Sequence, residues 1–484
     1  MSAPGLKVLD RRRAGVLLHA TSLPDSTHGA LGAAARRFVD WLAAAGFGVW
    51  QFLPLGPVGP DRSPYFARSN HAGDPGLVDL ETLAADGLIG AEAHAPRAAL
   101  LARAARALAE GGGAGSRAFQ DFRRREAHWL GDYALYVAIQ ARESGRPWWE
   151  WQPALRCREP AALATARAEL APLVAEIEAG QYFFHTQWHR LRAYAAERGV
   201  RFFGDLPIYV APDSVEVWAH PELFQLDGAG QPTAVAGVPP DYFSQDGQRW
   251  GNPLYRWEVH EATGFAWWLE RLRAQFELFD LVRIDHFRGL EAYWAVPASA
   301  PTAATGEWRL APGRALLERA RATFGGLEVV AEDLGVITPE VEALRDGFRL
   351  PGMRIAQFGF DGDQRNVHVL HHWTERSVGY TGTHDNDTTA GWFHGLDAAA
   401  QQWVRDYLAA APADVAAALS RAVLASVAEL AIVPMQDLLG LGTEARMNLP
   451  GTTEGNWGWR FDWGDVPLDL AGRCARWNRI YGRA

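Results

Sequence analysis

Eight short apolar segments constrain the fold more than any other feature of this sequence. Each is four to eight residues long and often β-branched, which is typical of strands buried on both faces of a parallel sheet. Amphipathic segments with helical spacing, such as 34–45 and 266–279, separate several of them and indicate crossover helices. Eight strands can close on themselves, so we predict an α/β fold of the (β/α)8 TIM-barrel type. The predicted strands are 15–19, 49–53, 200–207, 281–284, 327–331, 353–358, 377–381 and 430–434.

Two long segments interrupt this alternation. Residues 83–198 are rich in Ala, Arg, Leu and Glu at helical spacing, and we expect a helix-rich insertion after the second strand. Residues 211–257 are rich in Pro, Gly and Asp, which predicts an irregular insertion after the third strand. Only residues 435–484 follow the last strand, whereas a β-sandwich needs about 100 residues. We therefore predict one barrel over residues 1–484 with no C-terminal β-sandwich domain.

Composition excludes several classes of protein. The net charge of -10 and the lack of a basic block argue against nucleic acid and anionic membranes as partners. Two cysteines, Cys157 and Cys474, cannot form a disulfide framework and have no CxxC spacing. The apolar segment 14–18 is too short for a signal peptide, and no segment has the ~20 apolar residues of a membrane span, so we expect a cytoplasmic protein. The 21 tryptophans fit either a large core or sugar stacking.

Acidic side chains stand at the ends of four predicted strands. Asp205 lies at the third, Asp285 at the fourth, Glu332 at the fifth and Asp385 after the seventh. The carboxyl ends of barrel strands meet at one rim, where the active sites of this fold lie. Because gathering like charges in one place is costly, their convergence indicates a functional site rather than a stabilising one.

The pattern of these residues favours the chemistry of a retaining glycosidase. Arg283 and Asp285 are two residues apart in a strand and therefore point to the same side, where the cation would keep the carboxylate ionised as a nucleophile. Glu332 follows the apolar run VVA, whose burial would raise its pKa and suit it as the acid. A retaining site needs two such carboxyl groups about 5–5.5 Å apart. Asp385 and His384 could bind the ring hydroxyls.

Longer motifs along the chain resemble one family. They include AGVLLHATSLP, WQFLPLGPVG, GDLPIYVAPDSVEVW, VAGVPPDYFSQDGQRWGNPLYRW, DLVRIDHFRGLEAYW, VVAEDLGVITPEV, YTGTHDNDTT and PMQDLLGLGTEARMNLPGTTEGNWGWR. In content and order they resemble the 4-α-glucanotransferases of the α-amylase clan, called amylomaltase or disproportionating enzyme. The resemblance covers nearly the whole chain. Asp74 departs from it, since the family typically has Asn there.

The resemblance implies a reaction and a set of roles. It implies retaining transfer of an α-1,4-glucan segment to the 4-hydroxyl of an acceptor, through a covalent glucosyl-enzyme intermediate, with maltooligosaccharides as partners. It implies Asp285 as nucleophile, Glu332 as acid/base and Asp385 as transition-state stabiliser. It also implies a loop over the glucan at residues 239–253. The substrate-binding residues that it implies are Tyr65, Asp205, Gln248, Trp250, Arg283, His286, His384 and Asn456.

Two alternatives remain within the glycan-binding proteins. An α-amylase-type hydrolase would share the carboxylates, but the clan's Asp-x-x-x-Asn-His segment is replaced here by GDLPIYV. A non-catalytic glycan-binding barrel should have lost at least one carboxylate of the trio, and all three are present. We therefore favour the transferase. Acceptor length, cyclic products, the physiological glucan and the oligomeric state stay open.

A metalloenzyme is the third alternative. The run DGDQRN at residues 361–366 resembles the start of a calcium loop, but the Gly and the terminal Glu of such a loop are absent. His371 and His372 are adjacent, so on a helix they would point about 100° apart and could not share an ion. We expect no metal and no organic cofactor.

Overall fold

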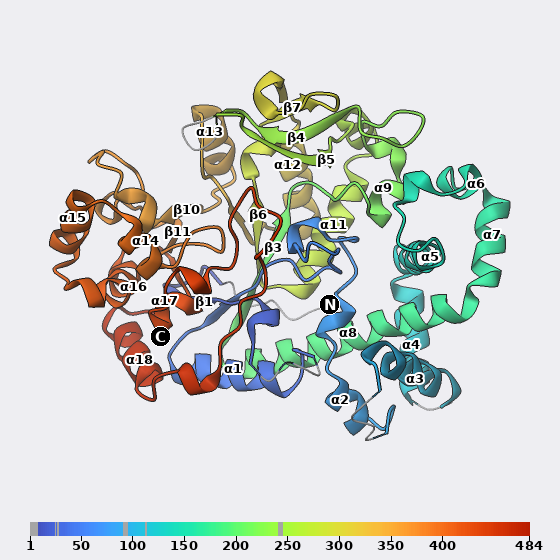
Figure 1. The fold of residues 1–484 in the computed structure, drawn as a ribbon, viewed down its shortest axis with the longest axis horizontal. Helices are drawn as coiled ribbons and strands as arrows, with labels where there is room; N and C mark the ends of the chain where they lie inside the picture. The colour runs from blue at the N-terminus through green and yellow to red at the C-terminus, as the bar shows by residue number, and fades with distance from the viewer. Residues whose placement is uncertain (1–7, 25, 27–28, 91–94, 112–113, 241–244) are drawn as a thin grey trace.

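The computed structural model describes residues 8–24, 26, 29–90, 95–111, 114–240 and 245–484. At its centre eight parallel strands follow one another in the order β10-β11-β12-β1-β2-β3-β6-β9 (Figure 1). All eight overlap the strands predicted from the sequence, which confirms the (β/α)8 fold class. The strands are β1 (Arg13–Leu17), β2 (Val49–Gln51), β3 (Arg201–Pro207), β6 (Leu281–Asp285), β9 (Val329–Ala331), β10 (Gly352–Ile355), β11 (Ser377–Tyr380) and β12 (Leu430–Pro434).

The barrel closes between β9 and β10, the two ends of the sheet order. The backbone N–H of Ala331 donates to the carbonyl of Pro351 at 2.9 Å. The Asp333 carboxylate accepts the backbone N–H of Met353 at 2.6 Å and so replaces a ladder hydrogen bond with a side-chain one. Asp333 is therefore part of the barrel seam, although it directly follows Glu332.

Helices cover the outside of the barrel between most of its strands. The connection from β10 to β11 differs, because residues 356–376, all of them described, contain only 3-10 turns. Phe360 in this connection packs against Trp392, Trp403 and Tyr407 of later helices, which shield the barrel there. The covering helices are α1 (Ala33–Ala44), α8 (Ala171–Glu197), α11 (Ala266–Leu278), α12 (Gly313–Phe324), α13 (Pro339–Gly347), α16 (Val415–Ala425) and α18 (Leu470–Ile480).

A group of helices between β2 and β3 projects from one end of the molecule, on the right of Figure 1. The long helix α8 links this group to the barrel: its Gln181 and Gln187 side chains each bond both backbone groups of a residue in the 73–79 loop. The division of the chain into a barrel and two insertions stays a prediction. The helices of this group are α3 (Arg97–Glu110), α4 (Ala114–Arg125), α5 (Leu130–Arg142), α6 (Pro153–Arg156) and α7 (Pro160–Glu169).

A second, antiparallel sheet stands over the carboxyl ends of the barrel strands, in the order β5-β4-β7-β8. Two of its strands lie within 211–257, where we expected irregular structure. The sequences AVAGV and QRWGNP contain Gly and Pro and lack polar–apolar alternation, so the usual strand signal is missing. Residues 241–244 of the predicted cover loop lie outside the described residues. The strands are β4 (Ala234–Val238), β5 (Gln248–Pro253), β7 (Ala292–Pro297) and β8 (Glu307–Leu310).

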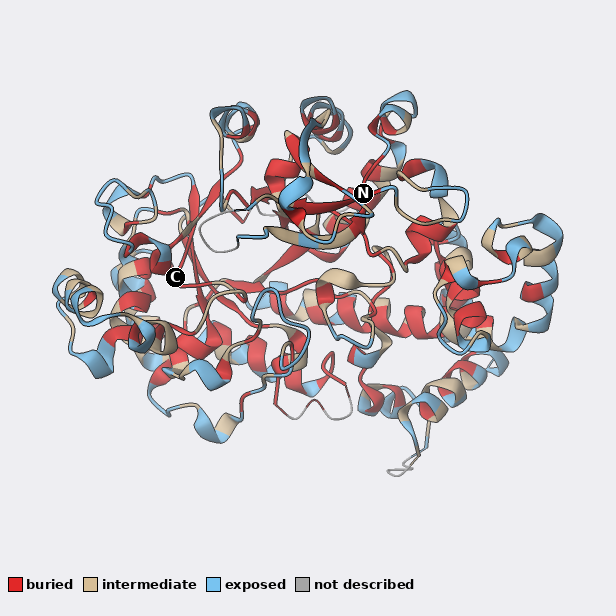
Figure 2. Cartoon of the chain, turned by 45° about the horizontal axis from the view of Figure 1, so that its top comes forward, coloured by how far each residue is buried: buried red, intermediate tan, exposed pale blue. Residues whose placement is uncertain are grey.

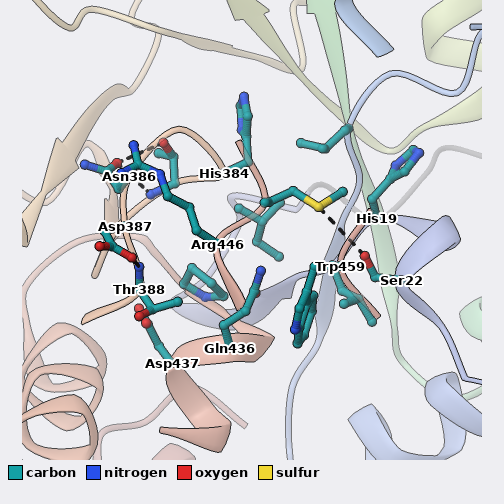
Figure 3. Close-up of a pocket in the computed structure, with 16 residues that line it drawn as sticks. His19, Ser22, His384, Asn386, Asp387, Thr388, Gln436, Asp437, Arg446 and Trp459 are labelled. Carbon is teal, nitrogen blue, oxygen red and sulfur yellow. Dashed lines mark hydrogen bonds between the residues drawn. The ribbon is translucent and has the colours of Figure 1, made fainter. Parts of the chain in front are cut away.

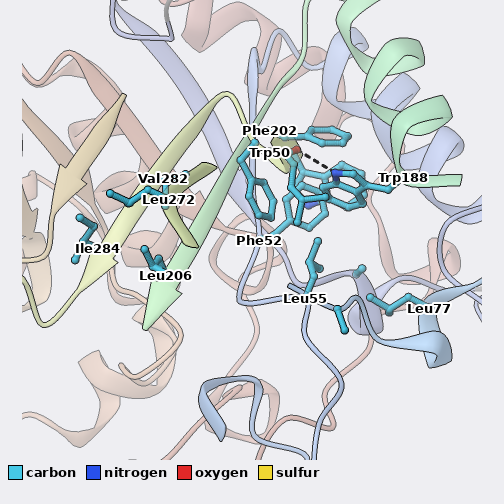
Figure 4. Close-up of a cluster of buried hydrophobic side chains, with 14 of the residues drawn as sticks. Trp50, Phe52, Leu55, Leu77, Trp188, Phe202, Leu206, Leu272, Val282 and Ile284 are labelled. Atoms are coloured by element: carbon cyan, nitrogen blue, oxygen red, sulfur yellow. Dashed lines mark hydrogen bonds between the residues drawn. The ribbon is translucent and has the colours of Figure 1, made fainter. Parts of the chain in front are cut away.

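Aromatic side chains fill the space between the barrel wall and α8 (Figure 4). The ring of Phe52 lies 4.3 Å from that of Trp50, 5.1 Å from Trp188 and 5.0 Å from Phe202. Trp50 and Trp188 are fully buried, and Figure 2 shows the barrel strands buried while the outer helices expose one face. Much of the tryptophan excess thus builds the core.

Residues 435–484, described throughout, contain helices and turns and no strand. Among the described residues no single helix has the length and apolar composition of a membrane span. The pair Ala398–Leu408 and Pro412–Ala425, bent by 69°, passes that test by length and composition only.

Candidate active site

Arg283 is the centre of the polar cluster at the rim. It is buried in β6, and its Nη1 donates to both carboxylate oxygens of Asp205 at 2.9 and 2.7 Å. Its Nη2 lies 2.7 Å from Oδ1 of Asp285, which is the contact that the two-residue spacing predicts. Tyr65 donates its hydroxyl to Asp205 at 2.7 Å. One guanidinium thus holds carboxylates from two neighbouring strands.

Glu332 directly follows β9 and faces the end of β6. Its backbone N–H donates to Ile284 O at 3.1 Å, and its carbonyl accepts the N–H of Phe287 at 3.1 Å. Its carboxylate accepts the backbone N–H of His286 at 2.6 Å and that of Leu334 at 2.9 Å. His286 has φ of 51°, a left-handed conformation that is uncommon outside Gly and turns its N–H toward Glu332.

Asp385 reaches the cluster from the loop after β11. Its Oδ1 lies 3.3 Å from Nε2 of His384. The ring of His384 stacks on Tyr65 with centroids 5.1 Å apart, which connects this loop to Asp205. The Asp385 side chain is 45% exposed, so it faces the open rim while Arg283 forms the floor.

Burial raises the pKa of both strand-end carboxyl groups. The pKa of Asp285 rises to about 8, because burial and the neighbouring Asp205, Glu332 and Asp385 outweigh the lowering by Arg283. Burial also raises the pKa of Glu332 above its usual range, against Arg283 and two backbone N–H groups. That direction agrees with our prediction from the apolar run before it.

The expected effect of Arg283 on Asp285 was only partly right. The contact forms, but we predicted that it would keep Asp285 ionised, whereas the pKa of this carboxyl rises. The physical reason is that burial of Asp285 outweighs the attraction of Arg283, and Asp205, which binds Arg283 through both oxygens, adds a like charge nearby. Asp285 and Glu332 interact and therefore titrate as a pair that shares protons.

The two histidines of the cluster are neutral. Burial, with help from Arg288 and Arg283, lowers the pKa of His286 to about 3. Burial lowers the pKa of His384 as well, although Asp385 opposes this. A neutral imidazole can donate a hydrogen bond to a hydroxyl oxygen without adding charge to the site.

Of the predicted substrate-binding residues on the two loops, Trp250 and Gln248 lie at the edge of the cluster and Asn456 does not contact it. Trp250 in β5 donates its Nε1–H to Gln248 Oε1 at 3.1 Å, and its ring meets that of His286 edge-on at 4.8 Å. Asn456 does not reach the carboxylates through any contact among the described residues. Its Oδ1 accepts the N–H of Leu449 and its Nδ2 donates to Thr452, so this side chain closes its own loop.

Two residues of the site were missed by the sequence analysis. Asn448 donates its Nδ2–H to Asp385 Oδ1 at 2.7 Å, and Arg446 donates to the backbone carbonyl of Asp385 at 2.6 Å. Both stand in a loop about sixty residues downstream rather than at a strand end, so the reasoning that found the carboxylates could not find them. Both residues belong to the motif ARMNLP, which contributed to the family resemblance but to which the sequence analysis assigned no role.

Two hollows flank the cluster. One, of about 430 Å³, lies behind His384 and is lined by His19, Gln436, Arg446 and Trp459 among others (Figure 3). The other, of about 520 Å³, opens beside Tyr65 and Asp205 toward α11. The two hollows thus reach the cluster at His384 on one side and at Tyr65 and Asp205 on the other.

Asp74, which departs from the family pattern, caps a 3-10 turn, and its carboxylate does not take part in the carboxylate cluster. Its carboxylate accepts the N–H of Gly76 at 2.7 Å at the start of the 3-10 turn Pro75–Leu77. Asparagine would serve equally there, because both side chains cap with an oxygen.

No group of three or more His, Cys, Asp or Glu side chains is arranged to hold a metal within the part of the chain that the structure describes. The expectation that no metal or cofactor is needed stays a prediction.

Comparison with known proteins identifies the family. A sequence model described as 4-alpha-glucanotransferase matches residues 18–465. The 4-alpha-glucanotransferase of Thermus thermophilus is 49% identical over 96% of this chain and 97% of its own length. That of Synechocystis sp. is 44% identical over 98% and 99%.

The chain belongs to the 4-α-glucanotransferase family. It is therefore an enzyme, a glycosyltransferase that acts on α-1,4-glucans. The amylomaltase from Streptococcus agalactiae in complex with acarbose has the same fold: the TM-score is 0.94 at 36% identity, covering 98% of this chain and all of that one. The family assignment favours the transferase over the hydrolase and the non-catalytic barrel.

Proposed function

We propose that this 4-α-glucanotransferase works by retaining double displacement, with Asp285 as nucleophile, Glu332 as acid/base and Asp385 as transition-state stabiliser. The proposal rests above all on Asp285 and Glu332 standing at the ends of adjacent parallel strands, with Glu332 bonded to the backbone of residues 284 and 286. Adjacent strands lie about 4.8 Å apart, which favours the ~5–5.5 Å separation of retaining enzymes over the ~6.5–9.5 Å of inverting ones.

In the first step an oxygen of Asp285 attacks the anomeric carbon of the donor glucan. The glycosidic C–O bond breaks, and protonated Glu332 gives its proton to the departing oxygen. Burial raises the pKa of Glu332, which favours the protonated form that this step needs. The products of this step are a glucosyl ester on Asp285 and the shortened glucan.

In the second step the 4-hydroxyl of an acceptor sugar attacks the same carbon. Glu332, now ionised, takes the hydroxyl proton, and the bond between carbon and Asp285 breaks. Two displacements at one carbon retain the α configuration. Asp385 and neutral His384 bind the ring hydroxyls, where hydrogen bonds strengthen as positive charge develops.

The protonation of the free site is consistent with Asp285 as nucleophile and Glu332 as acid/base. Burial, together with the neighbouring carboxylates, raises the pKa of Asp285 to about 8 although Arg283 contacts it, so the free site retains a proton at neutral pH. When a sugar excludes water, the proton must lie on the carboxyl group that faces the leaving oxygen. Asp285 holds a proton in the free enzyme, and we propose that this proton passes to Glu332 when the glucan binds, since the contact with Arg283 stabilises ionised Asp285.

Transfer rather than hydrolysis requires that an acceptor sugar reaches the intermediate before water does. Trp250 and Gln248 stand on β5 above His286, next to the acid/base side of the site. We propose that they form part of a cover over the acceptor sugar, with maltooligosaccharides as donors and acceptors.

The free cysteines Cys157 and Cys474 are compatible with the cytoplasmic location predicted from the sequence.

Incubation with maltotriose tests the proposed activity directly. A transferase converts it to glucose and a ladder of longer maltodextrins, whereas a hydrolase gives glucose and maltose with no ladder. The Asp285→Asn variant should produce neither, with turnover reduced by ~10⁴-fold or more, because an amide cannot attack. A ladder that persists undiminished in this variant would overturn the assignment of the nucleophile.

A further inference from the structure

Residues 446–448 hold Asp385 from two sides, and we call them the clamp. The Asn448 amide donates to Oδ1 of Asp385 at 2.7 Å, and Nη2 of Arg446 donates to the backbone carbonyl of Asp385 at 2.6 Å. Nε of Arg446 donates to the carbonyl of Asn448 at 2.7 Å, so the two clamp residues also fix each other. The clamp therefore acts on both the side chain and the backbone of Asp385.

Asp385 needs such support because its own loop offers little. Its side chain is 45% exposed, and its other side-chain neighbour at the rim is His384 at 3.3 Å. A half-exposed carboxylate on a loop samples several rotamers, and holding one of them costs conformational entropy. The amide of Asn448 binds one oxygen and leaves the second available to a ligand.

The clamp is continuous with the loop at residues 449–456. The N–H of Leu449 donates to Asn456 Oδ1 at 2.9 Å, and the N–H of Trp457 donates to Met447 O at 2.8 Å, which closes the loop on the clamp. The ring of Trp457 then lies 6.0 Å from His384. The loop thus begins and ends against the residues that surround Asp385.

We infer that Asn448 and Arg446 are positioning residues, which hold Asp385 in the orientation that binds the sugar hydroxyls and join that orientation to the 449–456 loop. The inference rests on the proposed role of Asp385. The hydrogen bonds between the loop and the clamp tie the position of Asp385 to that of the loop. The clamp residues act through Asp385 and need not touch the sugar.

The competing explanation is that Asn448 only fills space. Asn448→Asp separates the two explanations, because aspartate has nearly the same shape but cannot donate and repels Asp385. A space-filling role predicts that Asn448→Asp behaves like the wild type. The positioning role predicts that it is at least as impaired as Asn448→Ala.

The test measures kcat and KM for maltotriose disproportionation in both variants. We expect Asn448→Ala to lower kcat by about 10- to 100-fold, since a hydrogen bond to a charged group is lost, while KM changes by less than about threefold. Asn448→Asp should show a loss of the same size or larger. Arg446→Lys should fall between these variants and the wild type, because it keeps the charge but loses the paired bonds.

Glu444→Gln is the matched control: among the described residues, the side chain of this exposed glutamate bonds only to nearby Gly442, and the variant should behave as the wild type. Circular dichroism and the melting temperature check that each variant is folded. Asn448→Asp with kcat within about twofold of the wild type would overturn the inference, as would a loss confined to KM. Asp385→Asn is the reference: if it kept full activity, the proposed role of Asp385 would fail instead.

Discussion

Arg283 shows how one buried side chain organises the chemistry of the rim. Burial alone would lower its pKa, but contact with Asp205 and Asp285 raises the pKa well above its usual range, so it stays charged. Because this cation is shared, it orients Asp285 without fully offsetting the cost of burying that carboxyl group. The site therefore carries carboxyl groups whose protons are held more tightly than in water.

This cost of burial should appear in the stability of the enzyme. The folded pKa of Asp285 is about 8, whereas an unfolded aspartate titrates near 3.9, so the native state binds more protons between these values. The free energy of unfolding must then fall as pH rises through that window. We expect Asp285→Asn to raise the melting temperature relative to the wild type, and to do so more at about pH 8 than at about pH 5.

Thermal unfolding at both pH values measures this difference. Asp465→Asn, at an exposed aspartate near the C-terminus, is the control and should follow the wild type at both. Parallel pH dependence in the wild type and Asp285→Asn would show that Asp285 does not carry the extra proton.

The role of Glu332 predicts a dependence on the leaving group. Glu332→Gln removes the proton donor, so turnover of maltotriose should fall by about 10²- to 10⁴-fold. Fluoride leaves without protonation, and fluoride release from α-glucosyl fluoride in the first turnover should stay close to the wild type. Equal losses with both donors would argue against an acid role.

At the residue scale, the strand pattern predicted side chains at strand ends but carried no information about partners on later loops. Arg283 and Asp285 could be paired because a strand places alternate residues on one side. The sharing of Arg283 with Asp205 could not be foreseen, since the register between β3 and β6 is a tertiary property. Asn448 and Arg446 were missed because loop residues far along the chain have no periodicity that reports their partners.

At the element scale, continuous apolar segments located all eight barrel strands but not the second sheet. The strand β8, with the sequence EWRL, is exposed at every position and has no buried face to produce a pattern. The absence of an α-helix between β10 and β11 was also invisible, because the helices that replace it come later in the chain. Buried elements are thus easier to predict than the strands that shape the rim.

The position of Trp250 on β5 leads to a prediction about this element. Trp250→Ala removes the ring that meets His286, so water should reach the intermediate more easily. We expect the ratio of hydrolysis to transfer on maltotriose to rise several-fold, with weaker glucan binding. Glucose release and ladder formation, followed together by chromatography, measure this ratio.

Trp308→Ala is the matched control for this variant. Trp308 lies on β8 at the far edge of the same sheet, is 41% exposed and stacks on Arg288. The Trp308→Ala ratio should equal that of the wild type. An unchanged ratio of hydrolysis to transfer in Trp250→Ala would show that Trp250 does not protect the intermediate from water.

At the scale of the whole molecule, the chain end locks the barrel. Arg483 is buried, and its guanidinium donates to the carbonyls of Leu424, Arg13, Ser426 and Ala428 at 2.6 to 2.9 Å. It therefore joins the end of the chain to the start of β1 and to the segment before β12. These strands are neighbours in the barrel, so the contact supports the closed fold far from the carboxylates.

Removing this contact should reduce stability without changing the chemistry. Arg483→Ala leaves several carbonyls without a donor, and we expect the free energy of unfolding to fall by about 2–4 kcal/mol with kcat unchanged at low temperature. Urea unfolding and maltotriose assays measure the two effects. Arg479→Ala, at an exposed position of α18, should leave both unchanged. Wild-type stability in Arg483→Ala would contradict the account of the chain end.

The central claim is that a glucosyl group becomes covalently bound to Asp285, and mass spectrometry tests it most directly. The Glu332→Gln variant, incubated with α-maltosyl fluoride and quenched, should accumulate the intermediate, because the base for the second step is missing. The account predicts one maltosyl group on the peptide that contains Asp285, and none when Asp285→Asn is added. Fluoride release without an adduct, or an adduct on another carboxylate, would contradict it.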